Sequence, residues 1–260
     1  MRKTILTLLS AYIIFGLTVS ANAALIGHWD FEEGSGGLAL DSSGNLLHGT
    51  IFNASYATGR IGDYSLDFNG ANGYVEVGYS PLLNPDSIAI SLWFNPRETQ
   101  QTHADLLDKG HGGGTDPYFG GYVLQYSGDN SNIDAVYGNG STFPYINTGG
   151  NYKDNQWHHM VANFGVAEMA LYVDNVLIDK RAGEGAIMDN DSPLFFGRHR
   201  YLGRYFNGLI DDIRIYDSPL SQSKVTELYN ESSPVPEPSS LLLLGAGLVG
   251  LARLRKRSKV

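Results

Sequence analysis

Residues 171–178 read Leu-Tyr-Val-Asp-Asn-Val-Leu-Ile, two short apolar runs joined by Asp174 and Asn175. A two-residue turn between paired strands needs positive φ at both positions, and Asn and Asp are among the few residues with side chains that tolerate it. The stretch therefore predicts a β-hairpin, and similar strand-like segments surround it on both sides.

These segments predict an all-β domain. Several alternate polar and apolar residues with a period of two, as in Tyr74-Val-Glu-Val, which is typical of strands with one wet and one buried face. The other predicted strands cover residues 26–31, 64–68, 88–94, 122–126, 157–164, 169–173, 194–196 and 209–216. One helix is predicted, capped by Ser221 and ending at Tyr229, and we expect it to cover one end of the domain.

Charge and composition exclude several classes of function. Residues 24–232 hold 26 acidic and only 11 basic residues, an imbalance that repels nucleic acid and anionic lipid and attracts divalent cations. The chain has no cysteine, which excludes disulfides, thiol catalysis and cysteine-ligated zinc. No phosphate-binding loop, dinucleotide fingerprint or zinc-protease motif occurs.

The N-terminus predicts a secretory signal peptide over residues 1–23. Basic residues at positions 2 and 3 precede an apolar run from Ile5 to Val19, and Ala21-Asn-Ala23 is the small-x-small pattern that signal peptidase recognises. We expect cleavage after Ala23. The alternative is a retained membrane helix, which the short apolar run disfavours.

The C-terminus predicts a sorting and anchoring segment over residues 233–260. Val235-Pro-Glu-Pro precedes a short apolar membrane span, residues 239–252, and an Arg-rich tail from Arg253 that should stay cytoplasmic. This order closely resembles the PEP-CTERM sorting signal of Gram-negative, exopolysaccharide-producing bacteria. The resemblance implies processing by an exosortase and display at the cell envelope or in the extracellular matrix. The alternative is a plain inner-membrane tail anchor.

Residues 24–232 resemble a further family. The segments Trp29-Asp-Phe-Glu-Glu-Gly, Tyr64-Ser-Leu-Asp-Phe-Asn-Gly, Ser91-Leu-Trp-Phe and Phe206-Asn-Gly-Leu-Ile-Asp-Asp-Ile-Arg-Ile-Tyr follow in the order seen in concanavalin A-like, laminin G-like domains. The resemblance implies a jelly-roll sandwich of two antiparallel sheets. Members of this superfamily bind sugars, bind proteins or hydrolyse glycans, so the fold alone does not decide the function.

The sequence lacks the carboxylate pattern of a glycan hydrolase. Glycanases of this superfamily carry Glu-x-Asp-x-x-Glu on one strand face, and no such triplet occurs here. Asp211 and Asp212 are adjacent, so a regular strand would point them to opposite faces. We therefore expect no enzymatic activity. A hydrolase or lyase with carboxylates from separate strands stays as an alternative.

Asp211 is a candidate metal ligand. In a regular strand it would share a face with Leu209, Ile213 and Ile215, and a buried carboxylate needs hydrogen bonds or a cation. The family resemblance implies a structural Ca²⁺ near this strand and the loop after Asp41, with Asp41, Asn45, His48 and Asp211 as ligands. In the alternative, backbone amides satisfy both carboxylates.

Aromatic residues on predicted loops are the candidate ligand contacts, because a flat ring packs on a sugar ring while neighbouring polar groups bind hydroxyls. They are Tyr118, Phe119, Tyr145, Tyr201 and Tyr205. Each could instead be ordinary strand packing. The sequence thus predicts an exported, non-catalytic carbohydrate-binding or adhesion domain whose partner is a polysaccharide or a surface protein. A structural matrix protein without a specific ligand is the alternative.

Overall fold

The structure, a computed structural model, describes residues 23–110, 120–200 and 202–231. The predicted signal peptide, apart from its last residue, and the predicted C-terminal anchor lie outside these residues. Within the described ranges, no helix is long and apolar enough to cross a membrane.

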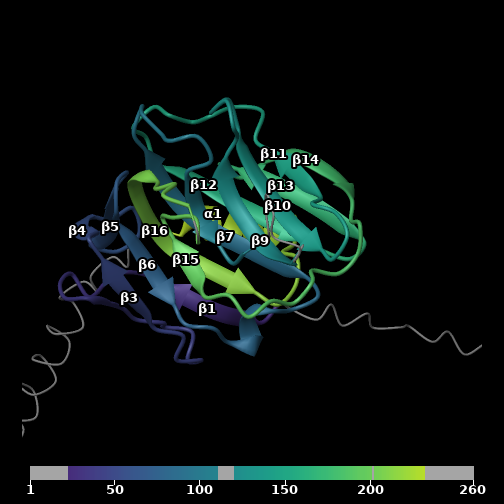
Figure 1. The fold of residues 1–260 in the computed structure, drawn as a ribbon, viewed down its shortest axis with the longest axis horizontal. Coiled ribbons are helices and arrows are strands. Elements are labelled where there is room, and N and C mark those ends of the chain that lie inside the picture. The colour runs from purple at the N-terminus through teal and green to yellow at the C-terminus, as the bar shows by residue number, and fades with distance from the viewer. Residues whose placement is uncertain (1–22, 111–119, 201, 232–260) are drawn as a thin grey trace, which may run out of the picture.

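Two antiparallel sheets of eight strands each form a sandwich, as predicted (Figure 1). In sheet A the strand order is β14 (Val176–Ala182), β13 (Glu168–Val173), β12 (His158–Phe164), β7 (Ile88–Pro96), β16 (Asn207–Tyr216), β5 (Tyr64–Asn69) and β4 (Ser55–Thr58), with β1 (Leu25–Trp29) also paired to β16. In sheet B it is β11 (Tyr145–Asn147), β10 (Ile133–Asn139), β9 (Gly120–Tyr126), β8 (Asp105–Asp108), β15 (Leu194–Phe196), β6 (Tyr74–Val77), β3 (Gly49–Phe52) and β2 (Leu38–Ala39).

The core lies between the sheets. Every second residue of the central strands points into it, as Ile88, Ile90, Leu92 and Phe94 do in β7. Across the two sheets, the ring of Trp29 meets the ring of Phe196 edge-on at 4.9 Å. Burial of these apolar side chains is the main driving force that holds the sheets together.

The hairpin predicted at Asp174 and Asn175 is confirmed, with φ of 50° and 65° at the turn between β13 and β14. All predicted strands are present. The sequence did not predict β2, β3, β4, β8, β10 and β11, which are short or lack clear alternation. Strand β8 is an example, because Asp-Leu-Leu-Asp places two apolar residues side by side.

The predicted helix is also present, as α1 (Gln222–Asn230), and the Ser221 side chain caps it by accepting a hydrogen bond from the Lys224 amide. Its expected position at one end of the sandwich is wrong. Val225 and Leu228 pack with residues from the outer face of sheet A, including Ala89 and Val161. The amphipathic helix covers this face because alternate residues of β7 and β12 are apolar there too.

A β-bulge in β16 corrects the predicted position of Asp211. Ile210, Ile213 and Ile215 all lie in the core, although a regular strand would alternate without interruption, and Asp212 has a φ of 49°. The bulge inserts one residue, so Asp211 does not share the core face with Ile213. It pairs instead with Trp93, which lies on the outer face of sheet A.

Candidate functional site

The outer faces of the two sheets differ in what covers them. Helix α1 packs on sheet A, whereas no helix among the described residues packs on sheet B, the sheet nearer the viewer in Figure 1. We call the outer side of sheet B the open face. Its strands β6, β8 and β15 border the segment 197–206, which connects β15 to β16 and supplies most of the unusual side chains described next.

Arg198 lies among three aromatic rings on this face. Its guanidinium carbon lies 4.4 Å from the ring centre of Tyr74, 5.0 Å from Phe195 and 5.9 Å from Tyr205. The same guanidinium donates hydrogen bonds to the carbonyls of His199 and Arg200, at 3.0 and 2.9 Å. These contacts fix the position of the cation among the rings. We call Tyr74, Phe195, Arg198 and Tyr205 the aromatic cluster.

Arg198 has no carboxylate partner among the described residues, and neither has Arg204. In contrast, Arg97, Arg214 and Lys224 each lie within 3.1 Å of a carboxylate oxygen. A domain with such an excess of acidic residues could pair every cation. Arg198 thus forms no ion pair with a described carboxylate, while the charge of Arg204 lowers the raised pKa of the buried Asp105 without a direct contact.

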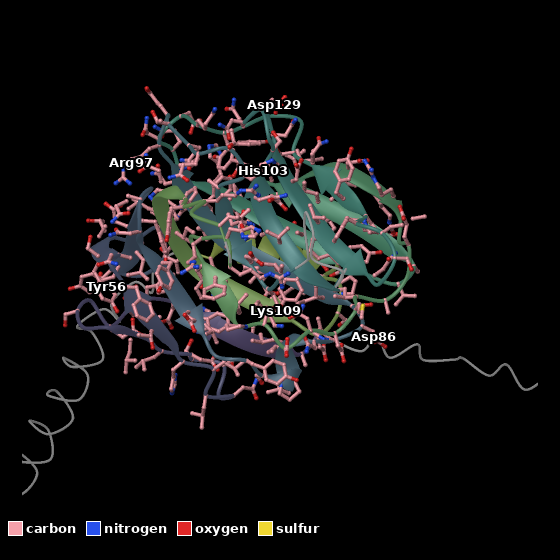
Figure 2. The ribbon with its side chains drawn as sticks, viewed as in Figure 1. Tyr56, Asp86, Arg97, His103, Lys109 and Asp129 are labelled. Carbon is pink, nitrogen blue, oxygen red and sulfur yellow. The ribbon has the colours of Figure 1, made fainter. Side chains whose placement is uncertain are left out.

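Lys109 lies at one end of β8 beside this segment (Figure 2). Its ammonium is fully buried and donates to the side-chain oxygens of Asn84 and Asn190, at 3.1 and 2.7 Å. Burial, together with the positive charge of Arg200, lowers the pKa of Lys109 to about 8. Among the described residues, the ammonium is thus held by amide oxygens rather than by a carboxylate.

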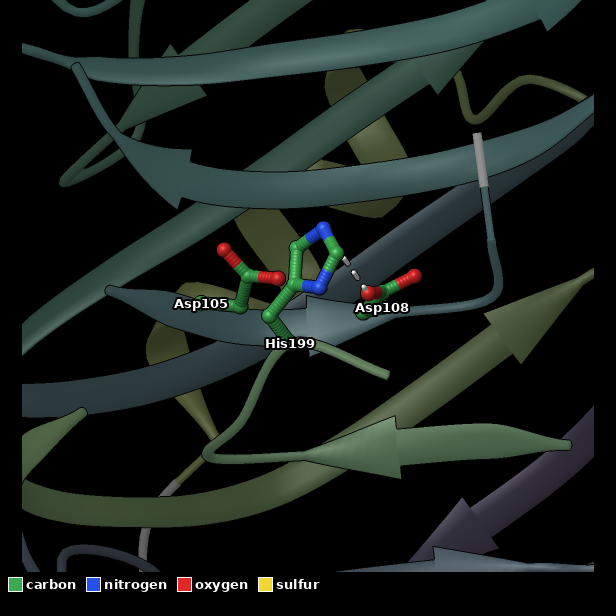
Figure 3. A group of neighbouring side chains, drawn as sticks. All are labelled: Asp105, Asp108 and His199. Carbon is green, nitrogen blue, oxygen red and sulfur yellow. Dashed lines mark ion pairs between the residues drawn. The ribbon is translucent and has the colours of Figure 1, made fainter. Parts of the chain in front are cut away.

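Beneath the segment 197–206, the carboxylates of Asp105 and Asp108 and the imidazole of His199 converge (Figure 3). One ligand atom from each lies within 4.8 Å of the others, and all three residues are buried. Asp108 accepts hydrogen bonds from the Gly110 amide and, at 2.9 Å, from the Arg200 amide. Asp108 therefore ties β8 to the segment that carries Arg198.

Asp105 is fully buried, yet neither of its carboxylate oxygens accepts a hydrogen bond from a described residue. Gln125, directly opposite in the ladder between β8 and β9, also has a buried side-chain oxygen without a donor. Burial, reinforced by the charge of Asp108, raises the pKa of Asp105 well above its usual value. Buried oxygens without donors are uncommon because each one costs free energy.

The residues predicted to bind calcium are held by hydrogen bonds. The Asp41 carboxylate accepts from the amides of His28, Ser43 and Leu47, the Asn45 amide donates to Ile26, and His48 Nδ1 accepts from the Asp41 amide. One oxygen of Asp211 accepts from the amides of Arg60 and Ile61, while the other has no donor, and burial raises the pKa of Asp211 to about 7.

Asp41, His48 and Asp211 do not form a group whose ligand atoms all lie within 4.8 Å. Backbone amides thus satisfy Asp41 completely and Asp211 in part, in the manner of the alternative prediction. The calcium site stays a prediction, and the function proposed below does not depend on it.

The predicted aromatic contacts are not brought together. Tyr205 belongs to the aromatic cluster, whereas Tyr145 is 52% exposed on β11, four strand positions away from β15 in sheet B. At about 4.8 Å per strand, this separates Tyr145, at one edge of the sheet, from Tyr205, near its middle, by roughly 20 Å. Tyr118, Phe119 and Tyr201 lie outside the described residues.

The sequence did not single out the other members of the site. Tyr74 and Phe195 were visible only as strand residues, and Arg198 as a neighbour of His199. The alternation in residues 74–77 does put Tyr74 on a wet face, which is a usable signal. No local signal pairs Asp105 with His199, because 94 positions separate them and they are joined by long-range contacts such as the ladder between β8 and β15.

A separate pocket of about 1060 Å³ lies on the sheet A side, lined by parts of β1, β16 and the start of α1. Its lining includes Leu25, His28, Arg214 and Lys224. Arg214 and Lys224 are both paired with carboxylates. The pocket therefore lacks the unpaired cations and the ring cluster of the open face.

An antiparallel sandwich of two eight-stranded sheets defines the class of jelly-roll β-sandwich domains. Residues 69–226, more than half of the chain, match the sequence profile of the concanavalin A-like lectin/glucanases superfamily. The chain belongs to this family, as its sequence motifs indicated. Residues 234–257 match the PEP-CTERM protein-sorting motif, which implies export and surface anchoring.

One curated relative is an adhesion G-protein coupled receptor V1 from Danio rerio, 28% identical over 159 residues. The match covers 58% of this chain and only 2% of the receptor, so it concerns one small part of a very long protein.

Two solved structures illustrate the shared fold. Domain 4 of AbnA, an extracellular arabinanase of Geobacillus stearothermophilus solved in complex with arabinotriose, superposes with a TM-score of 0.64 and 23% identity, covering 80% of this chain and 99% of that domain. The binding domain of Paraclostridial Mosquitocidal Protein 1 gives a TM-score of 0.65 and 19% identity, covering 80% and 52%. At these identities the likeness shows the fold alone.

Proposed function

We propose that this protein is a non-catalytic carbohydrate-binding domain displayed at the envelope of a Gram-negative bacterium, and that it binds polysaccharide at the open face. The observation that carries the proposal is the aromatic cluster, in which Arg198 has three rings around it and no carboxylate partner among the described residues. The preferred ligands are glycans that contain acidic sugars.

The chemistry of the cluster fits such a sugar. Tyr74 is stacked against Phe52 and Arg198, so the apolar contact to a pyranose ring would come from Tyr205. A guanidinium can bind a sugar carboxylate through two parallel hydrogen bonds. Because the domain is strongly acidic overall, an acidic glycan would be repelled unless a local cation received it. Arg198 and Arg204 are the cations placed to do so.

The positions of the carboxylates agree better with a binding role than with a hydrolytic one. A glycosidase needs two carboxyl groups that reach the glycosidic bond. Asp105 and Asp108 are close together, but both are completely buried beneath the segment 197–206. A glycan on the open face would not reach them. The arabinotriose held by the fold-related AbnA domain also favours a sugar ligand.

The sorting motif supports the proposed location. An exosortase-type enzyme is the proposed processing partner, and the inner membrane is the proposed site of anchoring before processing. After export the open face would meet extracellular polysaccharide, with a protein on a neighbouring surface as the alternative partner.

The test is an affinity measurement with the full-length chain in mild detergent. Immobilised polygalacturonate and alginate serve as acidic glycans, and arabinan and cellulose as neutral ones. We expect binding to the acidic glycans, and Arg198→Gln should weaken it at least about tenfold, the loss of about 1.4 kcal/mol typical of one charged hydrogen bond. Tyr205→Ala should weaken binding to a similar extent.

The matched control is Lys224→Gln, which removes one positive charge on the opposite side of the sandwich and should leave affinity unchanged. Equal loss in both charge variants would point to unspecific attraction instead of a site. Binding to neutral glycans that is insensitive to Arg198→Gln would move the site away from the aromatic cluster. Failure of all four glycans to bind would favour a protein partner or a purely structural role.

A further inference from the structure

The group formed by Asp105, Asp108 and His199 has no part in the sugar contacts proposed above. It lies below the open face, where β8 meets the segment 197–206, and no solvent reaches the carboxylate of Asp105 (Figure 3). A fully buried carboxylate without a hydrogen-bond donor is expensive, so its charge is either removed by a proton or balanced by a cation, and Arg204 supplies only part of that balance.

We propose that Asp105, Asp108 and His199 bind a divalent transition-metal ion of the Zn²⁺ type. Two atoms bound to one such ion at about 2.1 Å lie roughly 3 to 4 Å apart, so ligand atoms within 4.8 Å need only a small closing movement. Two carboxylates and the ion's two positive charges cancel. The fully buried group would then carry no net charge.

Three of the unsatisfied side-chain atoms near the site are oxygen acceptors, and Nδ1 of His103, two residues before Asp105, is also buried without a partner among the described residues. Both carboxylate oxygens of Asp105 lack a donor among the described residues, and so does the side-chain oxygen of Gln125 opposite it. If the packing were simply loose, buried donors and buried acceptors would lack partners equally often. A cluster of oxygen acceptors is the surrounding that a cation requires.

The ligand types select the kind of metal. Imidazole is a usual ligand of zinc and a poor one for calcium, which takes six to eight oxygens. Asp108 already accepts the amides of Gly110 and Arg200, which fixes the orientation of its carboxylate. Such backbone bonds to a ligand are the usual support around metal sites.

The position of the site gives it a consequence for the open face. Asp105 belongs to β8 and His199 to the segment that carries Arg198 and Tyr205, and Tyr205 also bridges to Asp105 through its backbone. An ion shared by Asp105 and His199 would fasten this segment to the sheet. It would hold the aromatic cluster in its observed arrangement.

The experiment measures Zn²⁺ binding directly. The full-length chain in detergent is stripped with a chelator and titrated calorimetrically with Zn²⁺, and then with Ca²⁺ in a parallel run. We expect one Zn²⁺ per chain, a higher melting temperature with Zn²⁺, and no comparable effect of Ca²⁺. Co²⁺ in place of Zn²⁺ should give visible absorption that reports its ligand geometry.

Asp105→Asn is the decisive variant, because asparagine keeps the shape and removes the uncompensated charge. It should fold at least as well as the parent without metal, and it should bind Zn²⁺ at least about 100-fold more weakly. His199→Gln should show the same loss. A second possible zinc ligand elsewhere, His158 beside Asp154 and Asp174, is controlled by His158→Gln, which should bind like the parent.

The proposal is overturned if the parent chain takes up no stoichiometric Zn²⁺, or if Asp105→Asn binds it as tightly as the parent does. In either case Asp105 would be neutralised by a proton alone. Because the readout is metal uptake, the result is independent of whether any glycan binds.

Discussion

Arg214 and Arg198 lie on the two outer faces of the sandwich, and their charges have different surroundings. On sheet A, the guanidinium of Arg214 lies 3.0 Å from Asp212 and binds both oxygens of Glu231 beyond helix α1, so its charge is neutralised inside the protein. On sheet B, Arg198 is surrounded by aromatic rings, and no described carboxylate lies within 4.0 Å of it.

The difference shows which charges serve the fold. A partly buried cation that is paired with two carboxylates and covered by a helix is neutralised within the protein. Removing one partner of such a group leaves the other charges unpaired. A cation with rings as neighbours leaves its charge free for a ligand. On sheet A, Arg60 also lies over a ring, that of Trp93 at 4.3 Å, so Arg198 is distinguished by having three rings around it on a face that no described helix covers.

Single substitutions of Arg214 and Arg198 by glutamine should have the largest effects on the free energy of unfolding. Arg214→Gln leaves Asp212, 3% exposed, with His28 as its remaining partner and leaves Glu231 unpaired, and we expect a loss of about 3 kcal/mol in the free energy of unfolding. Arg198→Gln should cost less, about 2 kcal/mol, since two backbone hydrogen bonds and ring contacts are lost but no carboxylate is left unpaired. Urea unfolding of both variants measures the contrast.

Glycan affinity should respond in the reverse order. Folded Arg214→Gln should bind acidic glycans like the parent, whereas Arg198→Gln should not. If Arg198→Gln proves the more destabilising variant, the distinction between the two faces is wrong.

The pH dependence of stability tests how completely helix α1 excludes water from the outer face of sheet A. His159 lies 1% exposed beside Trp93 and Tyr229 of α1, and burial lowers its pKa to about 4 despite the opposing charges of Asp212 and Asp174. The unfolded imidazole takes up its proton near pH 6.5, the folded one only near pH 4. Stability should thus be complete above pH 6.5 and fall by about 3 kcal/mol towards pH 4.

His159→Gln should remove most of that slope in unfolding measurements between pH 7 and pH 4. The adjacent His158 is a built-in contrast, because hydrogen bonds to Asp174 and Asp154 outweigh burial and raise its pKa. Its contribution is complete below pH 6.5 and is lost as the pH rises through its folded-state pKa. An unchanged slope in His159→Gln would mean that water reaches the imidazole.

The smallest expected effect comes from loosening the helix. Ser221→Ala removes the side-chain oxygen that caps α1 and should cost about 1 kcal/mol of stability. It should not alter glycan affinity, because α1 contacts only the sheet A side. Ser141→Ala, at an exposed turn residue, is the matched control and should change stability by less than about 0.5 kcal/mol. A lower affinity in Ser221→Ala would show that the two faces communicate.

The sequence determined the parts of this protein that depend on local pattern. Alternation in segments such as 74–77 specified strands, positive φ at Asp174 and Asn175 specified a hairpin, and Ser221 specified a helix start. The order of short motifs indicated the family. Each of these signals involves residues close together in the chain, where the backbone itself fixes their relation.

Only the tertiary structure decided where the chemistry lies. The bulge at Asp211 and Asp212 changed which side chains face the core, and a single inserted residue of this kind has no clear mark in the alternation. Asp105 and His199 meet because β8 and β15 pair across 86 or more positions. Pairings over such distances depend on how the whole core packs, which no local segment of the sequence encodes.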